Sequence, residues 1–171
     1  MRGAVVLATC LVGLLMISLS ANLARGNGAA PLVFTQTFHD ATLTMPVVFP
    51  CVGPPPGAPG SVTILYNGVF HMTVLTAGVG AGTGWVTMTA TGSFVFTPDD
   101  KTLPTFTGHV TVWDGASFNL KNFAATGILN IRATGSDGST LRFHDVMHIT
   151  VIGTDTSTPH IVVSFDKPTC A

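Results

Sequence analysis

The sequence predicts an all-β fold: an antiparallel barrel of about eight strands, with a two-sheet sandwich as the alternative. Three observations carry this prediction. Short β-prone runs alternate with Gly, Pro, Asn and Asp turn signals from Leu32 to Asp166. Within the runs, apolar and polar residues alternate with a period of two, as in strands that bury one face. No stretch beyond residue 30 combines apolar residues at helical spacing with helix caps.

The composition excludes several classes of protein. Charged residues make up 9 % of the chain and hydrophobic residues 46 %, whereas soluble domains average about 25 % charged residues. Disordered chains are rich in charge and poor in apolar residues, so disorder is not expected. The net charge of −1 provides no basic surface, and we therefore expect no nucleic-acid partner.

The first 26 residues have the three-part pattern of a secretory signal peptide. Met1-Arg2-Gly3 is a short positive start, residues 4–17 are almost uninterruptedly apolar, and small residues surround Ala24. The alternative is a transmembrane anchor, but the apolar run is shorter than the roughly 20 residues of a span. We predict cleavage near residue 26, secretion, and a mature chain without a membrane span.

Cleavage would remove Cys10 and leave two cysteines, Cys51 and Cys170. In an oxidising compartment two cysteines favour one disulfide, which here would join the start of the domain to its last residues. Two free buried thiols are the alternative.

Residues 27–171 are predicted to form one domain in three parts. An N-terminal segment with short strands covers 27–49, where Pro46 allows only an edge or bulged strand. A Pro/Gly-rich strap covers 50–60 because proline lacks the donor that a strand ladder needs. The β-barrel core covers 61–171.

Three segments inside the core carry turn or loop signals. Asn67-Gly68 lies between β-prone runs and predicts a hairpin turn, with a bend inside one long strand as the alternative. Asp114-Gly115 predicts a further turn. The glycine-rich run 77–84 predicts a hairpin loop, because it lacks the Lys-Ser/Thr of a phosphate-binding loop and no helix follows.

The turn Ser136-Asp137-Gly138 predicts a register for the strands around it. A three-residue loop with Gly138 in the left-handed conformation pairs Ile131 with Phe143 and Asn130 with His144. This register keeps apolar residues beside apolar residues, and burial should select it because a one-residue slip would reverse every side chain. It also places Arg132 opposite Arg142.

Alternation assigns one face of the predicted sheet to the core and the other to Thr, His, Asn and Arg. If the apolar face is the interior, the polar face meets solvent. If the sheet closes the other way, the polar face lines a cavity and forms a ligand site of His71, His109, Trp113, Asn130, Arg132 and His144. Asp145 falls on the apolar face, so it should lie near a strand end or have a buried partner.

The residues that could carry chemistry give weak signals. His144 and His148 have the spacing of a helical zinc motif, but on a strand they would lie roughly 13 Å apart. No Gly-x-Ser-x-Gly nucleophile motif is present, and cysteines in a disulfide supply no thiolate. We therefore predict no catalytic residue, no metal and no cofactor.

Several segments resemble small secreted β-rich proteins of actinomycetes. They are Tyr66-Asn67-Gly68-Val69-Phe70-His71, Thr97-Pro98-Asp99-Asp100, Phe106-Thr107-Gly108, residues 133–139, Phe143-His144-Asp145, and residues 164–168 with Cys170. The resemblance covers roughly residues 50–171. It implies secretion, a terminal cysteine pair and a single β domain. It implies no catalytic residue, because no activity is assigned to that group.

We expect non-catalytic binding of an apolar small molecule or a surface partner. One alternative is a cavity enzyme of the cyclase or isomerase type, using His71, His109, His144 and Arg132 for acid–base work. Another is a structural, envelope-associated protein without a ligand. A cavity with apolar walls would favour binding, a cavity with two imidazoles near one point would favour the enzyme, and a solid interior would favour the structural role.

Overall fold

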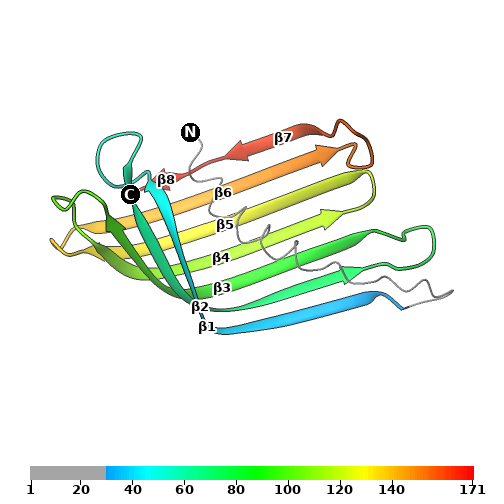
Figure 1. The fold of residues 1–171 in the computed structure, drawn as a ribbon, viewed down its shortest axis with the longest axis horizontal. Helices are drawn as coiled ribbons and strands as arrows, with labels where there is room; N and C mark the ends of the chain where they lie inside the picture. The colour runs from blue at the N-terminus through cyan, green and yellow to red at the C-terminus, as the bar shows by residue number, and fades with distance from the viewer. Residues whose placement is uncertain (1–29) are drawn as a thin grey trace.

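A computed structural model describes residues 30–171, which form one antiparallel sheet without a helix. The predicted signal peptide and its cleavage site lie outside these residues. The strands follow one another in sequence order from β1 to β7, and β8 pairs with β6 beyond the end of β7 (Figure 1). The strands are β1 (Leu32–Phe49), β2 (Ala58–Val74), β3 (Gly84–Pro98), β4 (Phe106–Phe118), β5 (Asn122–Gly135), β6 (Thr140–Ile152), β7 (His160–Asp166) and β8 (Thr169–Cys170).

The predicted all-β class and its eight antiparallel strands are confirmed, but the sheet is not closed into a barrel. Closure would require β1 to pair with β7, and these two strands are the edges of the sheet. Instead, the sheet coils over itself at one end. In Figure 1 the ends of β1 and β2 next to their connecting turn rise across the sheet towards β8 and the C terminus.

The coiled end is held by the predicted disulfide, which joins Cys51 in the β1–β2 turn to Cys170 in β8. Beside it, Phe49 at the end of β1 is 3 % exposed. Its ring centroid lies 5.3 Å from that of Phe143 on β6 and 5.8 Å from that of Phe94 on β3. The β1–β2 hairpin therefore covers the concave face here and encloses the main core. The other buried apolar residues of this core are Val52, Ala58, Val62, Ile64, Phe96, Phe106, Val110, Ile131, Ala133 and Leu141.

Two inward-facing glycines let the sheet bend so strongly. A side chain at Gly92 would meet the backbone of Leu65 on β2, and one at Gly108 would meet the backbone of Arg132 on β5. Glycine at such positions permits close approach of neighbouring strands and marks strong curvature.

The predicted face and register are confirmed. Ile131 pairs with Phe143 and Asn130 with His144, and Gly138 has a φ of +84°. The concave face carries the apolar residues of the alternating strands. The sequence-based sorting of side chains was therefore right, although the sheet that bears them is open.

Several local boundaries differ from the predictions. Asn67-Gly68 lies inside the long strand β2, so the bend alternative holds, and Asn67 Oδ1 accepts a hydrogen bond at 3.1 Å from the backbone N–H of the β1 bulge residue Asp40. The predicted turn at Asp114-Gly115 is wrong, because both residues lie inside β4. The strap is shorter than predicted, since β2 begins at Ala58.

Candidate functional site

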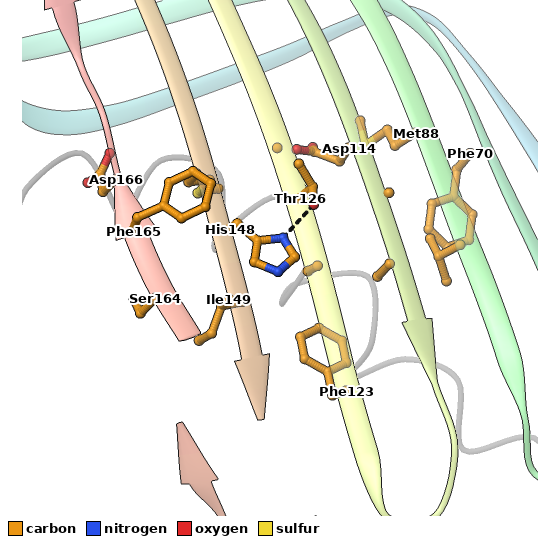
Figure 2. A pocket seen from close by; sticks show the side chains of 16 residues that line it. Phe70, Met88, Asp114, Phe123, Thr126, His148, Ile149, Ser164, Phe165 and Asp166 are labelled. Carbon is orange, nitrogen blue, oxygen red and sulfur yellow. Dashed lines mark hydrogen bonds between the residues drawn. The ribbon is translucent and has the colours of Figure 1, made fainter. Parts of the chain in front are cut away.

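Away from the disulfide, the concave face carries a groove that is open to solvent on one side and has a volume of about 130 Å³ (Figure 2). A cavity of about this size inside a protein holds a molecule such as benzene, and the open side lets a longer molecule extend. The inward-facing residues that line it come from β2 to β7: Phe70, Val86, Met88, Asp114, Ala116, Phe123, Ala125, Gly127, Met147, Ile149, Ser164 and Asp166.

Small residues in the middle of the sheet create the hollow. Ala116 on β4 pairs with Ala125 on β5, and the next inward position of β5 is Gly127. Larger side chains stand on either side, with Met88 on β3 and Met147 on β6. The groove is thus a depression between two ridges of apolar side chains. It adjoins the second buried cluster, formed by Phe70, Met72, Val86 and Met88.

The carboxyl group of Asp114 lies buried in this apolar wall. Asp114 is 6 % exposed, and its Oδ2 is buried with no hydrogen-bond partner. Gly127 provides its space, because a Cβ there would lie 2.6 Å from Asp114 Oδ1. Its inward neighbours across the strands are Met88 and Gly127, which carry no charge. Burial raises the pKa of Asp114 to about 6 because water no longer solvates the charged form.

Two further carboxyls, of Asp145 and Asp166, lie at the β6–β7 side. Asp145 is 5 % exposed and lies beside Asp166, which also lines the groove. Burial, and then the neighbouring Asp166, raise the pKa of Asp145 to about 6. A carboxyl beside a second carboxyl and away from water favours its neutral form. Asp145 was predicted to lie near a strand end or to have a buried partner. It lies inside β6, and its partner Asp166 is half-buried.

Asp114 makes the stability of the fold depend on pH. Its folded pKa lies above the unfolded value of 3.8, so its favourable contribution is complete below that value and is lost as the pH rises through about 6. The change in unfolding free energy caused by Asp114→Asn should therefore depend on pH. It should be more stabilising at neutral pH than near pH 4, by about 2–3 kcal/mol.

Denaturant unfolding followed by circular dichroism, at both pH values, measures this difference. Asp155→Asn, in the exposed β6–β7 loop, is the control and should not change the pH dependence. If Asp114→Asn unfolds with the wild-type pH dependence, burial does not perturb this carboxyl.

The residues predicted to form a ligand site lie on the opposite, convex face. His109, Trp113, Asn130, Arg132 and His144 are exposed on the adjacent strands β4, β5 and β6, whereas His71 is on β2 and half-buried. None of the six lines the groove. The structure thus brings five of them onto one surface and leaves His71 apart, so their ligand-binding role stays a prediction.

The histidines of the convex face are engaged by neighbouring polar side chains. His71 Nδ1 hydrogen-bonds to Thr35 at 2.8 Å, His109 Nε2 to Thr91 at 2.9 Å, and His144 Nδ1 to Asn130 at 2.7 Å. His148 bonds to Thr126 and stacks on Phe165 (Figure 2). Within residues 30–171 no group of three or more His, Cys, Asp or Glu side chains is arranged to hold a metal ion.

Sequence reasoning missed the groove and Asp114. A usable signal was present, because Asp114 shares its alternation phase with Val110 and Val112. However, the dipeptide Asp114-Gly115 is a turn signal, and it led to the prediction of a turn instead of an inward-facing carboxyl. The small residues Ala116, Ala125 and Gly127 gave no signal, because their effect depends on the register between two strands.

Comparisons with protein-family models, with curated proteins and with solved structures find no match. Within residues 30–171, the structure contains no helix with the length and apolarity that a membrane span requires.

Proposed function

We propose that this protein binds an apolar small molecule in the groove of its concave face, without catalysing a reaction. The observation that carries the proposal is the groove itself, a hollow with almost entirely apolar walls at the open half of the sheet. Apolar surface in contact with water costs free energy, about 25 cal/mol per Å², which an apolar ligand would recover by covering it.

The position of the groove favours binding of a small molecule over catalysis. An acid–base enzyme of the predicted type would need imidazoles directed at one point in a cavity. His71, His109 and His144 instead lie on the other face, bonded to Thr or Asn. Pockets for small molecules are typically apolar with a few polar groups that fix orientation, and the groove has this composition.

We further propose that the protein acts outside the cell after removal of residues 1–26. The disulfide between Cys51 and Cys170 supports this location, because such bonds persist in oxidising compartments. N-terminal sequencing of exported protein would give a start near residue 27. Retention of residues 1–26 on exported protein would contradict the proposal.

Filling the hollow should weaken binding. Ala125→Leu places a larger side chain on the groove floor, so the affinity for the neutral fluorescent probe N-phenylnaphthylamine should fall at least about tenfold, equivalent to about 1.4 kcal/mol. A fluorescence titration measures it.

Ala124→Leu is the matched control. It is the same substitution one position earlier on β5, where the side chain faces the opposite side of the sheet. This variant should bind the probe like the wild type. Equal affinity of Ala125→Leu and the wild type, or equal losses in both variants, would place binding outside the groove and overturn the proposal.

A further inference from the structure

The charges on the concave face have one sign. At the inward-facing positions of β2 to β7 the only carboxyls are those of Asp114, Asp145 and Asp166, and no Lys, Arg or His occupies such a position. Lys167 is directed elsewhere, with its Nζ 5.3 Å from the centroid of the Phe165 ring. His148 is the one basic residue that lines the groove, and it occupies an outward-facing position, where its Nδ1 is hydrogen-bonded to Thr126. The inward-facing side chains of the groove therefore carry carboxyls without a basic counter-charge.

Asp114 and Asp166 belong to one row of inward residues that crosses the groove. Met88 on β3 pairs with Asp114, then Gly127, Met147 and Asp166 follow on β5, β6 and β7. Both carboxyls line the groove, and each has one oxygen that is buried without a hydrogen-bond partner, Oδ2 in Asp114 and Oδ1 in Asp166. Buried polar atoms are normally satisfied, so the hydrogen-bonding capacity of these two carboxyls is not met by the protein itself.

We propose that the groove selects apolar molecules that carry a cationic amino group, and that the Asp114 carboxylate accepts the hydrogen bond from the ammonium. This inference rests on the proposed function and specifies the ligand class. The apolar part of such a molecule covers Ala116, Ala125 and the flanking methionines. Its ammonium neutralises a buried charge, and hydrogen bonds between charged groups are about twice as strong as those between neutral groups.

Asp114 is better placed for this role than the Asp145–Asp166 pair. Asp145 and Asp166 already lie against each other, whereas neither inward neighbour of Asp114 on β3 or β5 is polar. Along β4 itself, its inward neighbours are Val112 and Ala116. Two kinds of titratable group lie on further strands. The carboxyls of Asp145 and Asp166 favour a cation, and His148, which also lines the groove, is hydrogen-bonded to Thr126.

Ligand selectivity should therefore depend on pH. A primary ammonium stays charged up to about pH 10, as for lysine, so the change comes from the protein. The amine needs ionised Asp114, and burial raises the pKa of this carboxyl to about 6. The preference for an amine should be small near pH 5 and large near pH 8.

Competition of three eight-carbon molecules against N-phenylnaphthylamine tests the proposal. Octylamine, octanol and octanoate share the apolar chain and differ in the head group. At about pH 8, octylamine should displace the probe from wild-type protein at a concentration about tenfold lower than octanol, and octanoate should be the weakest. Asp114→Asn should bring octylamine and octanol within about twofold of each other, while Asp155→Asn should retain the preference.

The outcomes separate this inference from the proposed function. If the probe binds in the groove but octylamine and octanol compete equally at both pH values, the amine preference is wrong and apolar binding stands. The amine preference is also wrong if Asp114→Asn still prefers octylamine to octanol, or if octanoate is the best competitor of the three. If the probe does not bind at all, the proposed function fails first. The pH profile of the wild-type protein gives a test that does not depend on any variant.

Discussion

Removal of the disulfide should lower the free energy of unfolding by about 4–5 kcal/mol. Cys51 and Cys170 are separated by 119 residues, so the bond restricts a long loop of the unfolded chain. Marginal domains have total stabilities of about 5–15 kcal/mol, and the loss is therefore a large fraction of the total. The double variant Cys51→Ser/Cys170→Ser, unfolded in denaturant under the same conditions as the wild type, measures the difference.

The loss should begin at the coiled end of the sheet. Without the bond, the β1–β2 turn is held over β6 only by apolar contacts such as Phe49 with Phe143. Hydrogen exchange should therefore increase most in residues 47–60 and 141–145, and less at the pairing of Ala116 with Ala125. A double variant as stable as the wild type would contradict this account of how the coiled end is held.

Replacing Phe49 with alanine should cost about 3–5 kcal/mol of unfolding free energy. Phe49 is 3 % exposed and packs against aromatic rings from two other strands. Phe49 is the side chain through which the β1–β2 hairpin packs on the concave face at the coiled end. Its removal leaves a cavity, and the neighbouring rings cannot fill this cavity unless the hairpin moves.

Phe165→Ala is the matched control for Phe49. Phe165 lies on the edge strand β7 and is 39 % exposed, so this replacement should cost about 1 kcal/mol or less. Thermal and denaturant unfolding of the two variants compares a buried with an exposed phenylalanine. Equal losses would mean that Phe49 does not anchor the hairpin.

Much of the fold could be predicted because alternation is a local property. The sorting of Phe70, Met72, Val86 and Met88 onto one face needs only the two-residue period of a strand. The register at Gly138 followed from turn geometry and from matching apolar residues. The disulfide followed from the number of cysteines left after the predicted cleavage.

Whether the sheet closes into a barrel, and whether it forms a groove, depends on three-dimensional geometry that a local sequence pattern does not predict. Strand counts were consistent with a barrel, but whether β1 meets β7 depends on how much the sheet coils at glycines such as Gly92 and Gly108. The hollow depends on Ala116 standing beside Ala125 in the sheet. Asp114 was missed because Asp-Gly is a strong turn signal, and here the surrounding strand outweighed it.

The most direct test of ligand binding on the concave face uses the methionines as reporters. Met88 and Met147 line the groove, whereas Met45 pairs with Val62 near the disulfide end. In a spectrum of protein with isotope-labelled methionine methyl groups, octylamine should shift the Met88 and Met147 signals and leave that of Met45 unchanged. Unchanged Met88 and Met147 signals at saturating octylamine would contradict the account, as would shifts confined to Met45.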